Sequence, residues 1–581
     1  MLDSAAKAEF DKQHRVTQIV FLAMMASVLL YLVVGVVLRT SGGRGEGAGA
    51  DGALVYVFYG LAAGLIALIL LIRRRLIPST KAFQNSQSSL SELLVKYRTG
   101  YIVALALGES VGVLGLVLSL LSGSLTHLFR FCVVSIVLVV TAYPRKITRD
   151  RNTMKVLVVG SGGREHALVW KILQSRRVSR VYCEPGNGGT AREAGLPPHG
   201  FSRIEDLADF ARDEGIDLTV VGPEVPLTQG IVDFFEKQKL PILGPNLAAA
   251  RLEGSKLFAK QFMQRNNIPT SPYFKTASSE EARAILKDWC FGYPLVIKAD
   301  GLAAGKGVVI AGDPREAQLA IRQMLEDRAL GAAGDQILIE QYLVGEEVSF
   351  LVFTDGIHVL PMVPSQDHKR VFDGDCGPNT GGMGAYSTDW LLSPDLYRQV
   401  MDRIVYPTVL GMAAEGTPYR GILYFGLMLT ADGPPVLEFN VRMGDPETQP
   451  VLFRMKSDIM DVFEGILEKK LDQVPIEWSP GCSICVVLAS GGYPRVYEKG
   501  KPISGISEAE NLSGIKVFHA GTGLNGNQLV TTGGRVLGVT AYAEDLRSAI
   551  GLVYQAVERI HFDKIHFRRD IGAKGLRKIK G

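Results

Sequence analysis

The sequence predicts a multi-domain α/β protein that is preceded by an all-α membrane region of about four helices. Three observations lead to this prediction. The chain has 581 residues, which is too long for a single domain. Apolar residues make up 47% of the chain, and the excess lies largely before residue 145. Beyond Met154, apolar strands, glycine-rich turns and amphipathic helices alternate, which is typical of α/β domains.

The membrane region is predicted for residues 1–150 because this part contains long apolar runs. A run of about 20 apolar residues spans a bilayer as a helix. Lysines and arginines gather before the first run, between the second and third, and after the fourth, so both ends of the bundle are expected in the cytoplasm. The catalytic part would then be cytoplasmic. The predicted spans are residues 19–38, 53–72, 101–121 and 128–142.

Two residues of this part of the chain have alternative explanations. Glu109 falls within the third span, and a carboxylate inside a membrane is a candidate functional group. We favour the simpler interpretation, in which Glu109 packs against a neighbouring helix or lies near the interface. Met154 resembles an initiator methionine, because a strand starts directly after it. A protein that started at Met154 would be cytosolic.

Charge and cysteine content exclude two classes of protein. The net charge of +4 is small for this length, so nucleic-acid binding is not expected. Six scattered cysteines indicate a reducing compartment without a disulfide framework. Cys482 and Cys485 have the CxxC spacing, but they lie in an apolar run without a second pair. Two core cysteines are therefore favoured over a zinc site.

Residues 154–254 are predicted to form a doubly wound domain. Its first strand runs into the glycine-rich turn Gly160–Gly163 and then into a helix, and the N–H groups of such a helix start bind phosphate. This spacing alone is weak evidence, since similar turns only pack a helix on a sheet. A second glycine-rich turn contains Asn187. Glu224 follows a short strand, and ligands of open α/β sheets bind where strands end.

A glycine-rich loop between two strands suggests a site for a nucleoside triphosphate. The stretch from Tyr293 to Val308 reads strand, loop, strand, with Lys298 before the loop and Lys306 at its end. It is not a Walker loop, because no GK[ST] sequence begins a helix there. The strand that ends near Glu340 continues into a linker of the kind whose backbone binds adenine.

The stretch from Val436 to Glu447 concentrates polar groups suited to a metal–phosphate site. Side chains alternate along a strand, so Glu438, Asn440 and Arg442 should point to the same side. Two oxygen ligands followed by a cation are what a Mg²⁺–phosphate site needs. The alternative is a solvated edge strand. The glycine-rich loop upstream argues against it, since a phosphate loop and a metal edge need each other.

These motifs together resemble the glycinamide ribonucleotide synthetases, or phosphoribosylamine–glycine ligases, of the ATP-grasp superfamily. The resemblance runs from about Met154 to Lys574. The glycine loop and the EFN element indicate only the superfamily, whereas DHKRVFDGDCGPNTGGMGAY and GGYPRVYEKG indicate this member. In order, the motifs are GSGGREHAL, PGNGGT, VVGPEVPL, GSKLFAK, YPLVIKADGLAAGKGV, DHKRVFDGDCGPNTGGMGAY, LEFNVRMGDPETQ and ASGGYPRVYEKGKPISG.

The resemblance implies an ATP-grasp fold for residues 255–475 and a small α+β C-terminal domain for residues 481–575. It also implies a reaction in which ATP phosphorylates glycine. The amine of 5-phosphoribosylamine then attacks the glycyl phosphate, giving glycinamide ribonucleotide, ADP and phosphate. The cofactors implied are ATP and Mg²⁺ or Mn²⁺, and the substrates are small molecules.

The resemblance assigns roles to residues of each motif. Glu438 and Asn440 would hold the metal. Arg442 would stabilise the acyl-phosphate oxygens, and Asp445 would meet the amine of glycine or of the ribosylamine. The ATP-binding residues would be Lys256, Lys298, Gly305, Lys306, Glu340, Tyr342 and Glu347, with Lys306 also catalytic. The substrate-binding residues would be Gly160, Gly162, Gly163, Asn187, Glu224, Asp367, Lys369, Gly381 and Gly382.

Two other functions fit the same motifs. The chain could be another ATP-grasp carboxylate–amine ligase, or a membrane protein whose soluble part senses nucleotides. The basic residues of the C-terminal tail, from Arg568 to Lys580, are expected to be a solvated end.

Overall fold

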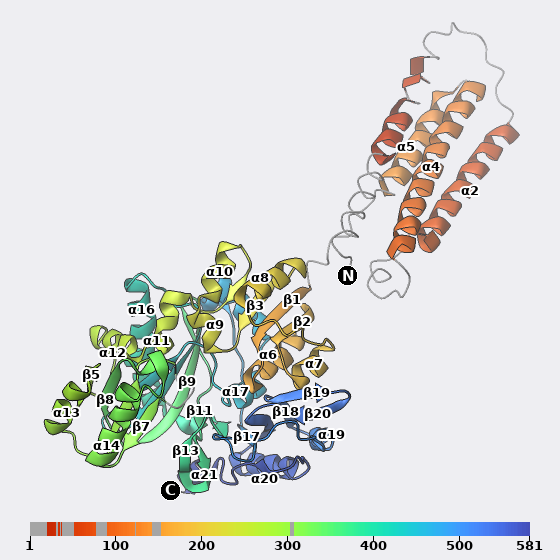
Figure 1. Cartoon of the computed structure of the whole chain (residues 1–581). Helices are drawn as coiled ribbons and strands as arrows, with labels where there is room; N and C mark the ends of the chain where they lie inside the picture. Colours follow the sequence, from red (N-terminus) through yellow and green to blue (C-terminus); the bar gives the residue numbers. More distant parts are fainter. Residues whose placement is uncertain are drawn as a thin grey trace. The chain divides into compact units, whose positions relative to one another are not determined.

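The computed structural model describes two compact units, Met1–Arg151 and Asn152–Gly581 (Figure 1). The described residues are 20–30, 33–34, 36–37, 52–76, 90–122, 124–141, 153–302 and 307–580.

The first unit is a bundle of helices. Its longest members are α2 (Gly52–Leu76), α4 (Leu90–Ser122) and α5 (Leu125–Thr141) (Figure 1). Glycines of α4 face α5, since a Cβ on Gly115 would lie 2.3 Å from Phe131. Small residues of this kind let two helices approach closely.

The four-span prediction is matched only in part. One helix, Ile102–Ser122, is long and apolar enough to cross a membrane. Three apolar helices are shorter: Val20–Leu30, Val55–Leu70 and Leu125–Val140. Residues 19, 31–32, 35 and 38 of the first predicted span, and residue 142 of the fourth, lie outside the described residues.

The second unit begins with a parallel sheet of order β2-β1-β3-β4. Its helices lie between the strands in sequence, as expected for a doubly wound domain. The burial of β1 on both faces explains its unbroken apolar run, Val156–Val159. The strands are β1 (Met154–Gly160), β2 (Val178–Pro185), β3 (Leu218–Val221) and β4 (Ile242–Leu243), and the helices include α6 (Gly163–Leu173), α7 (Gly188–Ala194), α8 (Ile204–Asp213), α9 (Glu224–Thr228), α10 (Ile231–Lys237) and α11 (Leu247–Gly254).

A four-stranded antiparallel sheet of order β5-β8-β6-β7 follows. It is reached through α12 (Lys256–Arg265), and α13 (Ser279–Lys287) and α14 (Pro314–Ile321) pack their alanines against it. The strands are β5 (Tyr273–Thr276), β6 (Leu295–Ala299), β7 (Val308–Ala311) and β8 (Ile337–Gln341).

The largest sheet has the order β16-β15-β9-β11-β14-β17-β21-β18. Its last three strands come from the C-terminal part of the chain, so the segment predicted as a separate C-terminal domain continues this sheet through the β14–β17 pair. The strands are β9 (Glu346–Thr354), β11 (Ser365–Asp367), β14 (Gly384–Ser387), β15 (Gly421–Leu429), β16 (Val436–Asn440), β17 (Cys482–Ser490), β18 (Ile515–His519) and β21 (Arg535–Ala543).

The CxxC pair lies inside this sheet. Cys482 and Cys485 are both buried free thiols of β17. No group of three or more histidine, cysteine or acidic side chains suited to a metal occurs among the described residues. The burial of both thiols in β17 agrees with the interpretation of the pair as core cysteines.

Candidate active site

One cavity of about 1220 Å³ collects side chains from every part of the second unit. Arg164 comes from α6 and Glu224 from α9, which belong to the domain of the first sheet. Lys298 and Glu340 come from the four-stranded sheet, and Glu438 from the largest sheet. The remaining predicted site residues that line it are Lys256, Tyr342, Glu347, Asp367, Lys369, Gly381, Asn440, Arg442 and Asp445.

One end of the cavity is built around the buried carboxylate of Glu340. Lys260 and Lys298 each place their Nζ 3.0 Å from Glu340 Oε2. Burial disfavours the charged form, but the two lysines hold the pKa of Glu340 below its usual value. The other oxygen, Oε1, is buried and accepts no hydrogen bond within the described part of the chain. It is therefore free to accept one from a ligand N–H group.

Lys256 enters the same end from the first residue of α12. Ser255 caps this helix by accepting from the Phe258 N–H, and Asp300 accepts from the Leu257 N–H at 2.7 Å. Burial lowers the pKa of Lys256, while Glu438 opposes the shift. Gly305 and Lys306, predicted to contact the triphosphate, lie in residues 303–306, outside the described residues.

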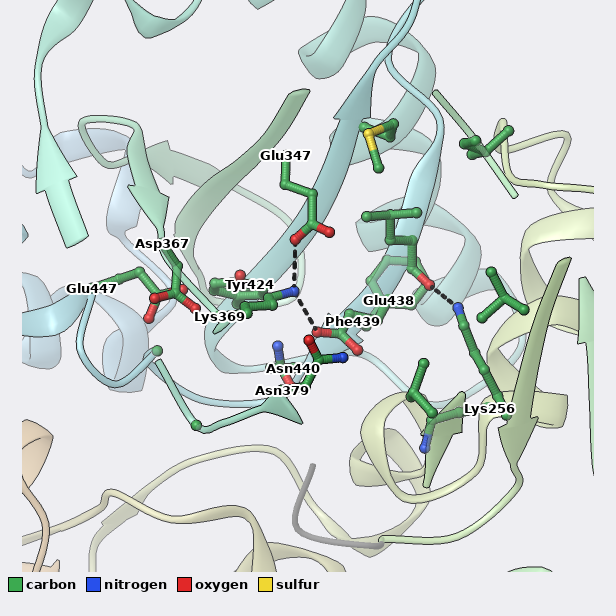
Figure 2. A pocket seen from close by; sticks show the side chains of 18 of the residues that line it. Lys256, Glu347, Asp367, Lys369, Asn379, Tyr424, Glu438, Phe439, Asn440 and Glu447 are labelled. Carbon is green, nitrogen blue, oxygen red and sulfur yellow. Dashed lines mark hydrogen bonds and ion pairs between the residues drawn. The ribbon is translucent and has the colours of Figure 1, made fainter. Parts of the chain in front are cut away.

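The middle of the cavity carries the two predicted metal ligands. Glu438 and Asn440 lie on the same side of β16, as the period of a strand requires (Figure 2). Lys369 Nζ lies between two carboxylates, 2.9 Å from Glu347 Oε2 and 3.7 Å from Glu438 Oε1 (Figure 2). Burial opposes ionisation, but Lys369 and Lys298 hold the pKa of Glu438 below its usual value.

This pair of oxygen ligands fits a metal that is bound through phosphates. Mg²⁺ keeps several waters and is commonly held by one or two protein oxygens plus substrate phosphates. A carboxylate and an amide oxygen at the edge of a lysine-lined cavity meet this requirement without a third protein ligand.

Arg442 lies where the first and the largest sheets meet. Its Nε donates to Glu224 Oε2 at 3.2 Å and its Nη2 donates to Glu253 Oε1 at 2.7 Å. Glu253 was not predicted from the sequence. Its Oε2 also accepts from the Val441 N–H at 2.7 Å, so it fixes both the backbone and the side chain around Arg442.

The carboxyl group of Glu253 should make stability depend on pH. Burial raises the pKa of Glu253 to about 7, although Arg442 opposes the shift. An unfolded glutamate titrates near pH ~4.3. Between these values the folded state keeps a proton that the unfolded state has lost, so stability falls as pH rises. We expect the Glu253→Gln variant to lack this fall, which amounts to at most ~4 kcal/mol.

Urea denaturation of both proteins at about pH 5 and about pH 8 measures the difference. Glu205→Gln, a change at an exposed carboxylate, is the control because it should leave the slope of stability against pH as it is. Parallel slopes for the wild type and Glu253→Gln would contradict the raised pKa.

The far end of the cavity is acidic and glycine-rich. Asp367 and Glu447 place their carboxylates side by side (Figure 2). Burial, and then the charge of Glu447, raise the pKa of Asp367 well above its usual value. Gly382 has a φ of +107°, and a Cβ there would lie 2.4 Å from Pro446, so only glycine fits this turn.

Asp445 is held by a residue from the C-terminal strands. Arg535 Nη2 lies 3.5 Å from Asp445 Oδ2, and Arg535 also donates to the carbonyl oxygens of Asp445 and Gly381. Gln449 donates to Asp445 Oδ1 at 3.0 Å. Burial favours the neutral acid, but Arg535 and Arg164 hold the pKa of Asp445 below its usual value.

The glycines of the first turn lie beside the cavity rather than in its lining. A Cβ on Gly160 would lie 2.5 Å from Glu165, and a Cβ on Gly163 would lie 2.6 Å from Gln449. Asn187 is buried: its Nδ2 donates to the carbonyl oxygens of Ser161 and His519, and its Oδ1 accepts from two N–H groups of α7. The described geometry thus places Arg164 and Glu224, and not Asn187, at the cavity wall.

Among the cavity residues that were not predicted are Glu253, Arg535 and Lys574. Glu253 directly precedes the GSKLFAK motif and lies in a mainly apolar helix, so it could have been selected from the sequence as a candidate site residue. Arg535 and Lys574 carry no comparable signal, because each reaches the cavity only through long-range folding.

A buried acid flanked by lysines, a metal edge on a strand and an antiparallel sheet beside them define an ATP-grasp ligase. Three family models match the chain: the N domain of phosphoribosylglycinamide synthetase over residues 154–253, its ATP-grasp (A) domain over residues 254–448 and its C domain over residues 483–574. The chain belongs to the phosphoribosylglycinamide synthetase family.

Relatives that carry this activity in their names align over nearly their whole length. The phosphoribosylamine–glycine ligase of Vibrio vulnificus strain YJ016 is 50% identical over 427 residues, which are 73% of this chain and 99% of that protein. The ligase of the same name from Escherichia coli K12 is 51% identical over 429 residues, again 73% and 99%. The resemblance found in the motifs is thereby confirmed.

Solved structures agree with the fold. The phosphoribosylamine–glycine ligase of Thermotoga maritima matches with a TM-score of 0.63 at 33% identity, over 72% of this chain and all of that one. The biotin carboxylase domain of Hydrogenobacter thermophilus 2-oxoglutarate carboxylase, solved with MgADP, matches with a TM-score of 0.54 at 19% identity over 71% and 91% of the two chains. The second likeness concerns the fold alone.

Proposed function

We propose that this chain uses ATP to join glycine to 5-phosphoribosylamine, giving glycinamide ribonucleotide, ADP and phosphate. The observation that carries this proposal is the single cavity, with lysines and Glu340 at one end, metal-binding oxygens in the middle and an acidic, glycine-rich end beyond them. Such a cavity brings a triphosphate and a small carboxylate together. The family of the chain supplies the identity of the substrates.

The reaction requires two anions, the γ-phosphate of ATP and the carboxylate of glycine, to approach each other. A glycine oxygen attacks the γ-phosphorus and ADP leaves, which forms glycyl phosphate. The amine of phosphoribosylamine then attacks the carbonyl carbon, loses a proton and releases phosphate. Charge neutralisation should therefore dominate catalysis. Lys256 and Lys298 face the triphosphate end, and Arg442 faces the acyl-phosphate oxygens.

A divalent cation bound by Glu438 and Asn440, Mg²⁺ or Mn²⁺, would neutralise phosphate charge there. The remaining assignments follow the cavity from end to end. Glu340 and the backbone near Tyr342 bind adenine, Glu347 the ribose, and Asp367, Lys369, Gly381 and Gly382 the small substrates. Asp445 meets an amine. Arg164 and Glu224 form the wall toward the phosphoribosylamine, behind which the turn at Gly160–Gly163 is shaped by Asn187.

ADP release by the purified protein tests this proposal. We expect release that requires both glycine and phosphoribosylamine, with glycinamide ribonucleotide formed in equal amount. Release that depends on a different acid would assign the chain to another group of ATP-grasp ligases. ATP binding without any turnover would favour a nucleotide sensor.

We infer that the first unit is a multi-pass membrane region and that the catalytic unit is cytoplasmic. Large apolar side chains point outward along its helices, which suits lipid as surroundings. They include Leu61, Leu68, Leu70, Val113, Val117, Leu120, Leu121, Phe129, Val133, Val137 and Val140. Membrane fractionation tests this: the full chain should need detergent, and a fragment starting at Met154 should not. A full chain that stays soluble without detergent would overturn the inference.

A further inference from the structure

The basic C-terminal tail is a solvated end only in part: Arg569, Arg577 and Lys578 are exposed, but Arg568 and Lys574 pack against other segments of the chain. Arg568 is only 1% exposed. The tail continues from β22 (Ile565–His566), which pairs with β17, into α21 (Ala573–Lys580), and Lys574 and Lys578 of this helix line the cavity. A buried arginine at the end of a chain needs partners that compensate for its lost hydration.

The partners of Arg568 lie on its own segment and on a distant hairpin. Nε and Nη2 donate to the two carboxylate oxygens of Asp570, each at 2.7 Å. Nη1 donates to Asp375 Oδ1 at 2.9 Å and to the Arg370 carbonyl oxygen at 3.1 Å. The hairpin is formed by β12 (Arg370–Phe372) and β13 (Cys376–Asn379). One guanidinium group therefore joins the tail to the first strand of the hairpin and to the turn that precedes its second strand.

Further bonds follow the same junction. Asp570 Oδ2 accepts from the Gly374 N–H at 2.9 Å, and Asp373 Oδ1 accepts from the Arg569 N–H at 2.8 Å. Lys574 Nζ lies 2.6 Å from Asp375 Oδ2. The segment 568–574 thus contacts the first strand and the turn of the hairpin at several points. We call this segment the C-terminal strap.

Residues at both ends of the hairpin line the substrate end of the cavity. Lys369 directly precedes β12, and Asn379, Thr380 and Gly381 end β13 or follow it. The nucleotide end is different, since Glu340, Lys298 and Lys256 stand on β8, β6 and α12, and their hydrogen bonds and ion pairs within the described residues do not involve the strap. Lys369 also pairs with Glu347 and Glu438, so a displaced hairpin should disturb the small substrates most and the ribose and metal groups to a smaller extent.

We propose that Arg568 is a positioning residue that sets the substrate end of the cavity through the hairpin. This inference rests on the proposed ligase reaction. A misplacement of about 1 Å can lower a reaction rate on the order of 10²-fold. Loss of the Arg568 side chain should therefore raise the KM for glycine on the order of tenfold or more and change the KM for ATP by a clearly smaller factor.

The amount of glycinamide ribonucleotide formed per ADP gives a second test of the role of Arg568, because it measures how tightly ATP use is coupled to amide formation. When the amine acceptor is held poorly, glycyl phosphate is lost to water: water attacks the carbonyl carbon, and glycine and phosphate are returned. We expect the Arg568→Ala variant to form less glycinamide ribonucleotide per ADP than the wild type. Neither this ratio nor a KM depends on the fraction of protein that is folded.

Arg454 provides a matched control. It is also 1% exposed, and it donates to Ser387, to the Asp389 carboxylate and to the Ser479 carbonyl oxygen. It contacts neither the hairpin nor the cavity lining. Arg454→Ala should lower the melting temperature as Arg568→Ala does, but leave the glycine KM and the product-to-ADP ratio unchanged.

Two milder changes keep the inference testable if Arg568→Ala does not fold. Asp375→Asn weakens two ion pairs of the strap, those with Arg568 and Lys574, at an exposed residue, and should shift the glycine KM in the same direction by a smaller factor. Arg568→Gly should recover product per ADP when guanidinium ion is added at millimolar concentration, whereas Arg454→Gly should show no such change in this ratio.

Glycine-dependent ADP release by the wild-type protein distinguishes a failure of the proposed function from a failure of this inference. If the wild type shows no glycine-dependent ADP release, the proposed function fails. If the wild type is active, but Arg568→Ala or Asp375→Asn changes only stability or kcat, with the glycine KM and the coupling ratio as in the wild type, Arg568 is structural and the inference is overturned.

Discussion

Replacing Glu438 with alanine should lower glycine-dependent ADP release on the order of 10²-fold or more. Glu438 lines the cavity beside Asn440, and Lys369 and Lys298 keep its pKa below the usual value, so it is ionised at neutral pH. A charged oxygen ligand fixed before the reaction begins stabilises the phosphoryl group without reorganisation. Its loss should also raise the concentration of Mg²⁺ needed for half-maximal rate.

The neighbouring amide supplies the control for this experiment. Asn440→Asp keeps an oxygen ligand at the same place and should retain much more activity than Asn440→Leu, which has none. Initial rates at several Mg²⁺ concentrations measure both effects. Intact turnover in Glu438→Ala at low Mg²⁺ would show that the metal edge lies elsewhere.

The polar side of β16 shows what could be predicted from the sequence. The period of two along a strand placed Glu438, Asn440 and Arg442 on one side, and all three line the cavity. The strands of the first sheet could also be predicted from the sequence, because β1 and β3 are largely apolar and are followed by glycine-containing turns. Local pattern was sufficient to place the polar side chains of β16 on one face of their strand.

Contacts between distant segments could not be predicted from local sequence patterns. Arg535 reaches Asp445 because β21 joins the sheet through β17, and Arg568 reaches Asp375 across nearly 200 positions. Such contacts follow from strand order, which no local pattern encodes. The buried part of the basic tail was misjudged for the same reason, since a run of charges predicts solvent exposure unless its partners are known.

Asn187 shows a second limit of the sequence. Its place in a glycine-rich turn suggested a substrate ligand, and its role there stays a prediction. In the structure its amide caps α7 and holds the Ser161 carbonyl oxygen. A residue type that binds phosphate esters also caps helices, and the pattern of a turn does not distinguish the two.

Arg442→Ala should combine a large loss of turnover with a loss of stability. The guanidinium group is held between Glu224 at 3.2 Å and Glu253 at 2.7 Å. Removing one partner of a buried ion pair costs roughly 3–5 kcal/mol, because the remaining charges are uncompensated. The loss of stability should grow as pH rises. Without Arg442 the pKa of Glu253 moves further upward, so the ionised form of Glu253 is disfavoured in the folded state. Turnover should fall on the order of 10²-fold to 10³-fold.

A second substitution separates the two roles of Arg442. In Arg442→Ala/Glu253→Gln the buried charge is gone, so urea denaturation should show that much of the lost stability returns. Turnover should stay low, because no cation faces the acyl-phosphate oxygens. Arg442→Lys keeps a charge but cannot donate to both carboxylates at once, and should fall between the wild type and Arg442→Ala. If the double variant regains wild-type turnover, Arg442 acts only by compensating Glu253, and the cation that stabilises the acyl phosphate must be sought among Lys256, Lys298 and Arg164.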